Sequence, residues 1–131
     1  TKPDIVSHNL ETVRRLTPSV RSVARYETSL RVIHIIADSG VTAKSGIMVG
    51  LGETETEVAE TMDDLLENGC QILTIGQYLQ PTRKHYPVAA YITPEQFASY
   101  KETALQKGFR LVESGPLVRS SYYAEKQIQQ F

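Results

Sequence analysis

Cysteine is almost absent from this chain, which has only Cys70 among its 131 residues. A single thiol excludes a disulfide within the chain and the usual metal sites built from several cysteines, and it favours a reducing compartment. No apolar run approaches the roughly 20 residues that cross a membrane. The net charge of −1 offers no basic surface to a nucleic-acid backbone. We therefore expect neither a membrane nor a nucleic acid as a partner.

An initiating methionine is also lacking, since the chain begins Thr1-Lys2-Pro3. This absence leads us to expect a piece of a longer protein. The apolar fraction of 40% and the length suit one globular unit with a sizeable core. No repeat or change of composition divides residues 1–131, so we predict a single unit.

Short apolar segments alternate along the chain with segments whose apolar residues recur at helical spacing. Predicted strands lie at 4–9, 41–49, 70–76 and 109–118. Predicted helices lie at 25–39, 54–69 and 93–108, and each stops at a glycine. Such alternation is typical of βαβ units with a parallel sheet, and three or four strands are too few for a closed barrel of eight. The predicted class is α/β, either a small open sheet or part of a larger barrel.

Two of the predicted helices carry clear start signals. Thr54 suits the N-cap with Glu57 as its capping-box partner, and Thr93 precedes Pro94 at the first helical position. The apolar stripes predicted to face the core are Tyr26, Leu30, Ile33, Ile36 and Ala37; Val58, Met62, Leu65 and Leu66; and Phe97, Tyr100, Ala104 and Leu105.

Polar residues gather where the predicted strands end. Ligands of parallel sheets bind beyond the C-terminal ends of the strands, so we expect these loops to converge on one rim. Gly50-Leu51-Gly52 before a helix suggests a phosphate cradle, but the glutamates that follow oppose an anion. The alternatives are a tight turn that needs positive φ, and a site where Glu53 meets a neutral or cationic ligand.

Four further features admit two interpretations each. Lys44 either points inward, where it needs a negative partner or a ligand, or outward with no role. His8 is expected to hydrogen-bond with a ligand or a neighbouring loop rather than to bind a metal. The run Arg83-Lys84-His85 is either a solvated loop or a mouth that meets an acidic partner. Cys70 is predicted to be a core residue rather than a reactive one.

The residues described so far resemble the radical S-adenosylmethionine superfamily. Gly46–Glu53 looks like the Gly-x-Ile-x-Gly-x-x-Glu strand that lies against the adenosyl group, and His8–Val13 resembles a loop that holds the ribose. Two segments are more specific, Gly76–Arg83 and Gly115–Tyr122, and both resemble the C-terminal half of the lipoyl synthase family. The second contains two hydroxyls beside Arg119 at the end of a predicted strand, an unusual choice for packing.

The resemblance implies a fold and a chemistry. The fold would be the C-terminal part of a partial TIM-like (β/α)6 radical S-adenosylmethionine barrel, with residues 115–131 as a tail. The enzyme would insert two sulfur atoms at C6 and C8 of a protein-bound octanoyl group, using S-adenosylmethionine and two [4Fe-4S] clusters. The implied cofactor-binding residues are Asn9, Glu11, Lys44, Gly46, Met48, Gly50, Gln77, Leu79 and Gln80.

The resemblance further implies that Ser121 ligates the auxiliary cluster. The family's cluster cysteines match nothing in this chain, so we assign no catalytic residue and expect the isolated chain to be inactive. We also expect it, on its own, to be marginally stable, to self-associate or to need a partner. Implied partners are an octanoylated lipoyl-carrier domain or glycine cleavage H protein, and ferredoxin or flavodoxin as electron donor, in the bacterial cytoplasm or an organellar matrix. The alternatives are a biotin-synthase-like enzyme and a nucleoside-binding half-barrel without chemistry.

Overall fold

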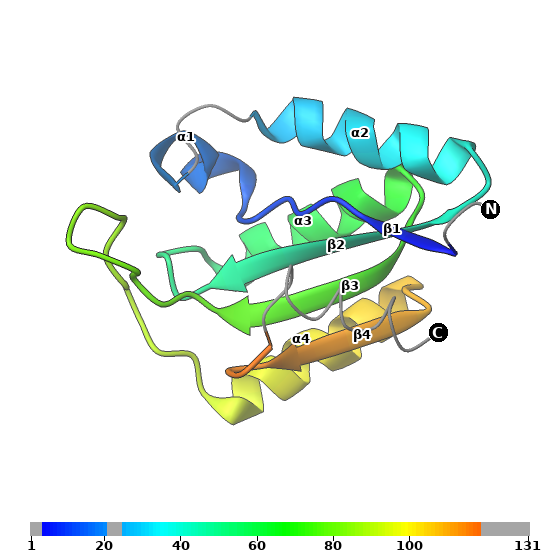
Figure 1. The fold of residues 1–131 in the computed structure, drawn as a ribbon. Coiled ribbons are helices and arrows are strands. Elements are labelled where there is room, and N and C mark those ends of the chain that lie inside the picture. The colour runs from blue at the N-terminus through cyan, green and yellow to red at the C-terminus, as the bar shows by residue number, and fades with distance from the viewer. Residues whose placement is uncertain (1–3, 21–24, 119–131) are drawn as a thin grey trace.

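The computed structural model describes residues 4–20 and 25–118 and contains a single parallel sheet (Figure 1). Its strands lie side by side in chain order, and every neighbouring pair is parallel. They are β1 (Ile5–Ser7), β2 (Thr42–Val49), β3 (Cys70–Gln77) and β4 (Leu111–Gly115). β1 and β4 are therefore the edges of the sheet in the described part of the chain. The predicted α/β class is confirmed, and the arrangement is consistent with part of a barrel.

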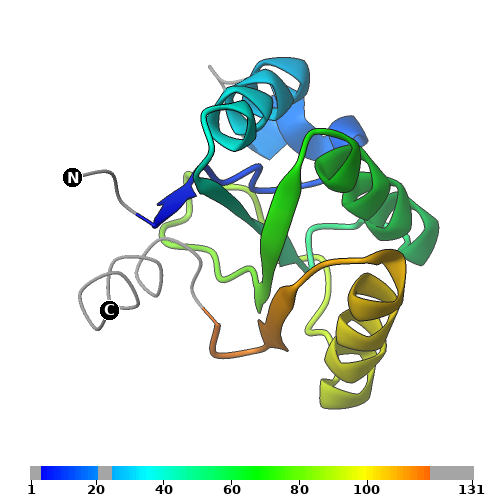
Figure 2. The ribbon, with the colours of Figure 1, turned by 90° about the vertical axis from the view of Figure 1, so that its right-hand side faces the viewer.

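One long helix directly precedes each strand after the first, and these three long helices cover the same face of the sheet (Figure 2). They are α2 (Tyr26–Asp38), α3 (Glu55–Glu67) and α4 (Pro94–Lys107), and all three were predicted. Two short helices before α2, η1 (Arg14–Leu16) and α1 (Thr17–Val20), were not predicted. No helix in residues 4–20 and 25–118 combines the length and the apolar character that crossing a membrane requires.

The predicted helix caps are present. The Thr54 hydroxyl accepts a hydrogen bond from the Glu57 N–H at 3.1 Å, and the Glu57 carboxylate accepts one from the Thr54 N–H at 2.9 Å. Thr93 likewise accepts from the N–H of Gln96 at 3.1 Å, with Pro94 as the first helical residue. Each cap satisfies backbone groups that have no partner inside the helix, which fixes where α3 and α4 begin.

The core lies between the sheet and the three helices. Alternate residues of β2 and β3, including Ile47 and Ile75, pack there against the helical stripes. Between Ala43 and Lys44 the register with β3 shifts by one residue, and this irregularity brings Cys70 to the core side. The prediction that Cys70 is a core residue is confirmed.

Two predictions about the fold are wrong in detail. Leu105 is 44% exposed, because it lies one position beyond Ala104 and therefore points away from the core. The last strand ends at Gly115 rather than at Val118. Pro116 offers no N–H to a neighbouring strand, and the Val118 N–H donates to the Gly115 carbonyl at 3.2 Å in a turn. Residues 119–131 of the predicted tail lie outside the described residues.

Candidate functional site

The face of the sheet opposite the helices carries the candidate site, and we call it the inner face. Its residues are in register across the strands, in three rows that run from the N-terminal to the C-terminal ends. The rows are Ser7, Lys44, Ile72 and Leu111; Gly46, Thr74 and Glu113; and Met48, Gly76 and Gly115. Polar residues and glycines predominate on this face, and Met48, Ile72 and Leu111 are its apolar members.

Lys44 is the most deeply buried charged residue of this face, with 1% of its surface exposed. Burial lowers the pKa of its ammonium group, while the negative charge of Glu113 acts in the opposite sense. Of the two alternatives for Lys44, the inward one is therefore correct, and Glu113 two strands away is a negative partner. A buried charge is costly unless it is paired, so this pair marks the face as more than a packing surface.

Thr74 lies between Gly46 and Glu113 in the middle row. Its side chain is 1% exposed, and its hydroxyl oxygen has no hydrogen-bond partner among the described residues. An unpaired buried hydroxyl costs roughly 1–3 kcal/mol, and such atoms are typically paired with protein, water or a ligand. The inner face therefore offers both a charge pair and an unused hydroxyl to a polar ligand.

The loop after β1 continues alongside β2. Backbone hydrogen bonds join the His8 N–H to the Lys44 carbonyl at 2.9 Å, the Glu11 N–H to the Gly46 carbonyl at 3.0 Å, and the Met48 N–H to the Glu11 carbonyl at 2.8 Å. These bonds place Asn9 and Glu11 next to the strand that carries Lys44, Gly46 and Met48. The loop after β1 therefore lies along β2 towards the C-terminal end of that strand.

Glu11 adopts a backbone φ of +78°, the one positive φ of a residue other than glycine in the described part. This conformation costs a side chain with a Cβ roughly 1–2 kcal/mol. The two backbone bonds to Gly46 and Met48 hold it in place. Strain of this kind concentrates at functional sites, where a side chain must be presented in a fixed direction.

The Gly50-Leu51-Gly52 turn is occupied by the chain's own carboxylate. Glu53 accepts hydrogen bonds from the Gly50 N–H at 3.1 Å and from the Leu51 N–H at 2.9 Å. Gly50 and Gly52 have φ of +97° and +108°. The turn therefore has the tight geometry considered from the sequence, and Glu53 fills the place that an anion would take in a phosphate cradle. The suggestion that Glu53 meets a ligand is not supported, because the turn uses its carboxylate.

Arg15 braces the same turn from the other side. Its guanidinium donates to both carboxylate oxygens of Glu57, at 2.7 and 2.9 Å, and to the Gly52 carbonyl at 2.9 Å. The hydrogen bond from Arg15 and the backbone bond from Thr54 lower the pKa of Glu57 to about 2. One carboxylate thus caps α3 and ties the turn to the segment that contains η1.

This ion pair predicts an acid-sensitive contribution to stability. The folded protein binds the Glu57 proton less tightly than the unfolded chain does, whose ordinary pKa is 4.5. The stabilisation is therefore complete above pH about 5 and declines as the pH falls from there towards 2. Glu57→Gln keeps the capping geometry without the charge. We expect its melting temperature to lie below that of the wild type at pH 7 and to approach it at pH 2–3; a constant difference would contradict the pairing.

The loop after β3 folds back onto Gly50 through Gln77. The Gln77 amide donates to the Ala90 carbonyl at 3.0 Å and accepts from the Ile92 N–H at 2.8 Å. The Ala89 N–H donates to the Gly50 carbonyl at 2.7 Å. The third loop therefore meets the second at the C-terminal ends of the strands, as predicted, and the Gln77 amide holds it there.

The tip of this loop is exposed but internally braced. Gln80 donates to the His85 carbonyl at 3.0 Å, and the Thr82 hydroxyl lies 2.8 Å from His85 Nδ1. Leu79 is 49% exposed at the start of the tip. Arg83 and Lys84 are exposed, which agrees with the solvated-loop interpretation.

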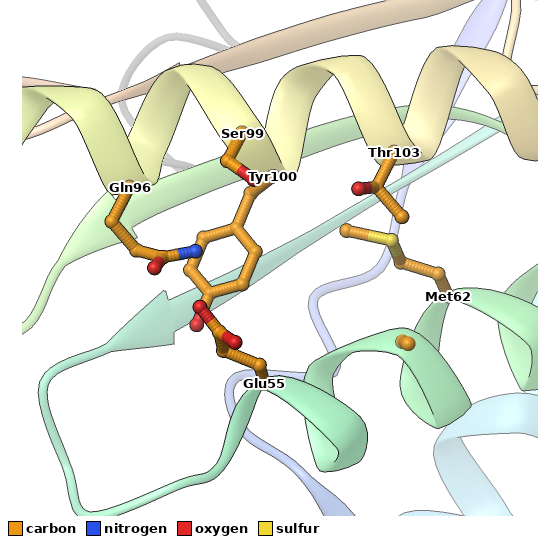
Figure 3. Close-up of a pocket in the computed structure, with 7 residues that line it drawn as sticks. Glu55, Met62, Gln96, Ser99, Tyr100 and Thr103 are labelled. Atoms are coloured by element: carbon orange, nitrogen blue, oxygen red, sulfur yellow. The ribbon is translucent and has the colours of Figure 1, made fainter.

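A separate groove lies between α3 and α4 on the helix side of the sheet (Figure 3). Glu55, Gln96 and Tyr100 gather at one end of it, and Met62 and Thr103 at the other. Burial, with the charges of nearby glutamates, raises the pKa of Tyr100 to about 12, so its hydroxyl remains protonated. The groove holds only about 150 Å³ and does not communicate with the inner face, from which the sheet separates it.

The described residues do not supply a metal centre of their own. No three His, Cys, Asp or Glu side chains group together in residues 4–20 and 25–118. Burial raises the pKa of Cys70 to about 12, and its thiol donates to the Ile72 carbonyl at 3.3 Å. This thiol is unsuited to ligation, which requires the thiolate. Ser121, the metal ligand implied by the resemblance, lies outside the described residues.

Sequence reasoning missed three contributors to this region. Thr74 and Glu113 lie within predicted strands, but only the register of three neighbouring strands places them beside Lys44. Arg15 is distant in sequence from the turn it braces. The remaining implied residues, among them Asn9 and Leu79, lie on loops at the C-terminal side of the sheet, and their contact with a cofactor stays a prediction.

Comparison with known proteins gives close relatives. The chain is 73% identical over 127 residues to a lipoyl synthase of Bacteroides fragilis, 70% over 128 residues to one of Phocaeicola vulgatus, and 61% over 127 residues to one of Treponema denticola. These alignments cover 97–98% of the chain and 44–45% of the relatives. No family model matches the chain.

The chain thus spans less than half the length of the curated relatives that it matches. Its similarity to them extends across every strand and helix described above. By sequence, these 131 residues belong to the lipoyl synthase family and correspond to part of one of its members.

Proposed function

We propose that the chain forms the S-adenosylmethionine-binding side of a lipoyl synthase, which inserts two sulfur atoms into a protein-bound octanoyl group. The identity of 61–73% to lipoyl synthases supports this reaction rather than that of biotin synthase. When bound, S-adenosylmethionine supplies the 5′-deoxyadenosyl radical that removes hydrogen from C6 and C8. The acceptor would be an octanoylated lipoyl-carrier domain or H protein, and ferredoxin or flavodoxin would supply electrons in the cytoplasm.

The inner face suits a ligand that carries charges, hydroxyls and a flat base. Lys44 and Glu113 offer charges of both signs, and Thr74 offers a hydroxyl without a partner among the described residues. We assign Asn9 and Glu11 to the ribose, the backbone of Gly46–Gly50 to the adenosyl group, and Gln77, Leu79 and Gln80 to the loop that closes over it. The strained backbone of Glu11 supports its part in this assignment.

Iron–sulfur ligation needs residues beyond those described. Cys70 is buried in the core, so the cysteines for both clusters have to come from the rest of the protein. We propose Ser121 as the one ligand that this chain contributes. Without the other ligands the isolated chain is expected to be inactive.

The single observation that carries the proposal is the buried Lys44 on the inner face. In the complete protein, Lys44→Met combined with Glu113→Gln removes the charge and leaves no unpaired carboxylate. We expect the dissociation constant of S-adenosylmethionine to rise by about 10- to 100-fold, the equivalent of one charge-assisted hydrogen bond. Isothermal titration calorimetry measures it.

Lys101→Met is the matched control, because Lys101 is exposed on α4 and lies on the other side of the sheet. It should leave the dissociation constant unchanged. If the double variant is folded and binds S-adenosylmethionine as tightly as the wild type, the inner face is not the binding site.

A further inference from the structure

The chain that follows β4 returns across β3 at Gly76. The turn closed by the bond from the Val118 N–H to the Gly115 carbonyl reverses its direction. A Cβ atom at Gly76 would meet the backbone carbonyl of Val118 at well under 3.0 Å, a separation that real Cβ atoms essentially never show. The three heavy atoms nearest to that position all belong to Val118. The backbone of Val118 therefore lies directly on the inner face of β3.

Gly76 is a glycine because of this close approach rather than because of its backbone conformation. It lies within a regular strand, and its φ is not in the left-handed region. Gly115, its partner in register on β4, offers a direct contrast. A Cβ at Gly115 would meet only the end of the Val118 side chain, at an ordinary 3.8 Å. Of two neighbouring glycines in one row, only Gly76 needs to lack a side chain.

We propose that Gly76 is a positioning residue. Because it has no Cβ, the Val118 carbonyl packs directly against its Cα, and this contact sets where the chain enters the Arg119–Tyr122 segment. The inference rests on the proposed function, in which Ser121 of that segment is a cluster ligand. Two residues, Arg119 and Ser120, separate Val118 from Ser121. The three steps of the chain from Val118 to Ser121 span at most about 10 Å. A change in the position of Val118 is therefore expected to change the position of Ser121, the proposed cluster ligand.

The size of the expected effect follows from the geometry. A methyl group at position 76 forces the Val118 carbonyl to retreat, and misplacement of a reacting or ligating group by about 1 Å lowers rates by about 100-fold. The carbonyl belongs to the backbone, so no change of rotamer relieves the contact.

The experiment compares the wild type, Gly76→Ala and Gly115→Ala in the complete protein. Hydrogen–deuterium exchange in the peptide that contains the Val118 N–H should be about tenfold faster in Gly76→Ala and unchanged in Gly115→Ala. Only the first substitution displaces the Val118 carbonyl from β3. The yield of sulfur-containing product, measured at saturating S-adenosylmethionine, should fall by about 100-fold in Gly76→Ala.

Exchange at Val118 that is the same in Gly76→Ala and the wild type would overturn the proposal, and so would faster exchange with an unchanged product yield. If the wild type itself makes no sulfur-containing product, the proposed function fails. The comparison of hydrogen–deuterium exchange at Val118 then decides alone whether Gly76 positions this residue. If Gly76→Ala is insoluble, Pro116→Gly loosens the same turn without changing β3. It should then raise exchange and lower the yield, and no change in either would overturn the proposal.

Discussion

Alanine at position 50 is expected to lower the free energy of unfolding by about 3 kcal/mol, through backbone strain and overpacking together. Gly50 has a φ of +97°, which L residues with a Cβ rarely adopt. A Cβ there would also collide with the side-chain amide of Gln77 and the carbonyl of Ala90. Both groups are already engaged with each other, so neither moves without losing a hydrogen bond.

The matched control for this substitution is Gly40→Ala. Gly40 has a similar φ of +92°, but nothing lies within 4 Å of the Cβ position. The control therefore measures the backbone strain alone, about 1 kcal/mol. Unfolding in denaturant, followed by circular dichroism, gives both values. Equal losses in the two variants would show that the contact of Gly50 with Gln77 and Ala90 contributes nothing.

Gly50 also connects this stability effect to the proposed site. The Val49 carbonyl accepts from the Tyr78 N–H, and the Gly50 carbonyl accepts from the Ala89 N–H, so the loop after β3 is built on this turn. Displacing the turn displaces Leu79 and Gln80 with it. A Gly50→Ala protein that still folds should therefore bind S-adenosylmethionine more weakly than the wild type.

Local signals in the sequence predicted the helices well. Thr54 with Glu57, and Thr93 with Pro94, fix the helix starts through contacts within four residues, so no knowledge of the fold is needed. The end of β4 was placed too far along, although Pro116 carried the information that pairing stops there. The short helices η1 and α1 were missed, although Thr17-Pro18 in α1 repeats the Thr-Pro pair that begins α4.

The candidate site was predictable only in part. Alternation along β2 left the direction of Lys44 open, because the polar residues Lys44 and Ser45 are adjacent and alternation places one of them on each face. The sequence left open whether Glu53 meets a ligand or belongs to a tight turn, and the structure directs its carboxylate to the N–H groups of Gly50 and Leu51. Glu113 and Thr74 became site residues only through the pairing of β2, β3 and β4, which are separated by whole helices in the sequence.

The second large effect is expected at Ser121 in the complete protein. Ser121→Ala removes one hydroxyl and changes none of the residues assigned to S-adenosylmethionine. Since its proposed role is confined to the auxiliary cluster, we expect formation of 5′-deoxyadenosine to continue, while sulfur insertion falls by 100-fold or more, about 3 kcal/mol in barrier. Ser120→Ala, next to it in the chain, is the matched control and should retain sulfur insertion.

Measuring 5′-deoxyadenosine and sulfur insertion separately distinguishes a role of Ser121 in the auxiliary cluster from a role in S-adenosylmethionine binding. Loss of both products in Ser121→Ala would place this hydroxyl in the S-adenosylmethionine site or in the fold itself. Retention of both products would show that the reaction does not need the Ser121 hydroxyl. Mössbauer spectra of the variant should show altered iron sites in one cluster only, because the proposed ligand belongs to one cluster.

The most direct test is mass spectrometry of an octanoylated carrier after incubation of the complete protein with S-adenosylmethionine and a reductant. We predict 5′-deoxyadenosine together with an acyl chain that has gained two sulfur atoms in the wild type, and 5′-deoxyadenosine without the sulfur-containing chain in Ser121→Ala. A wild-type protein that forms 5′-deoxyadenosine but leaves the octanoyl chain free of sulfur would contradict the assignment of this chain to lipoyl synthesis.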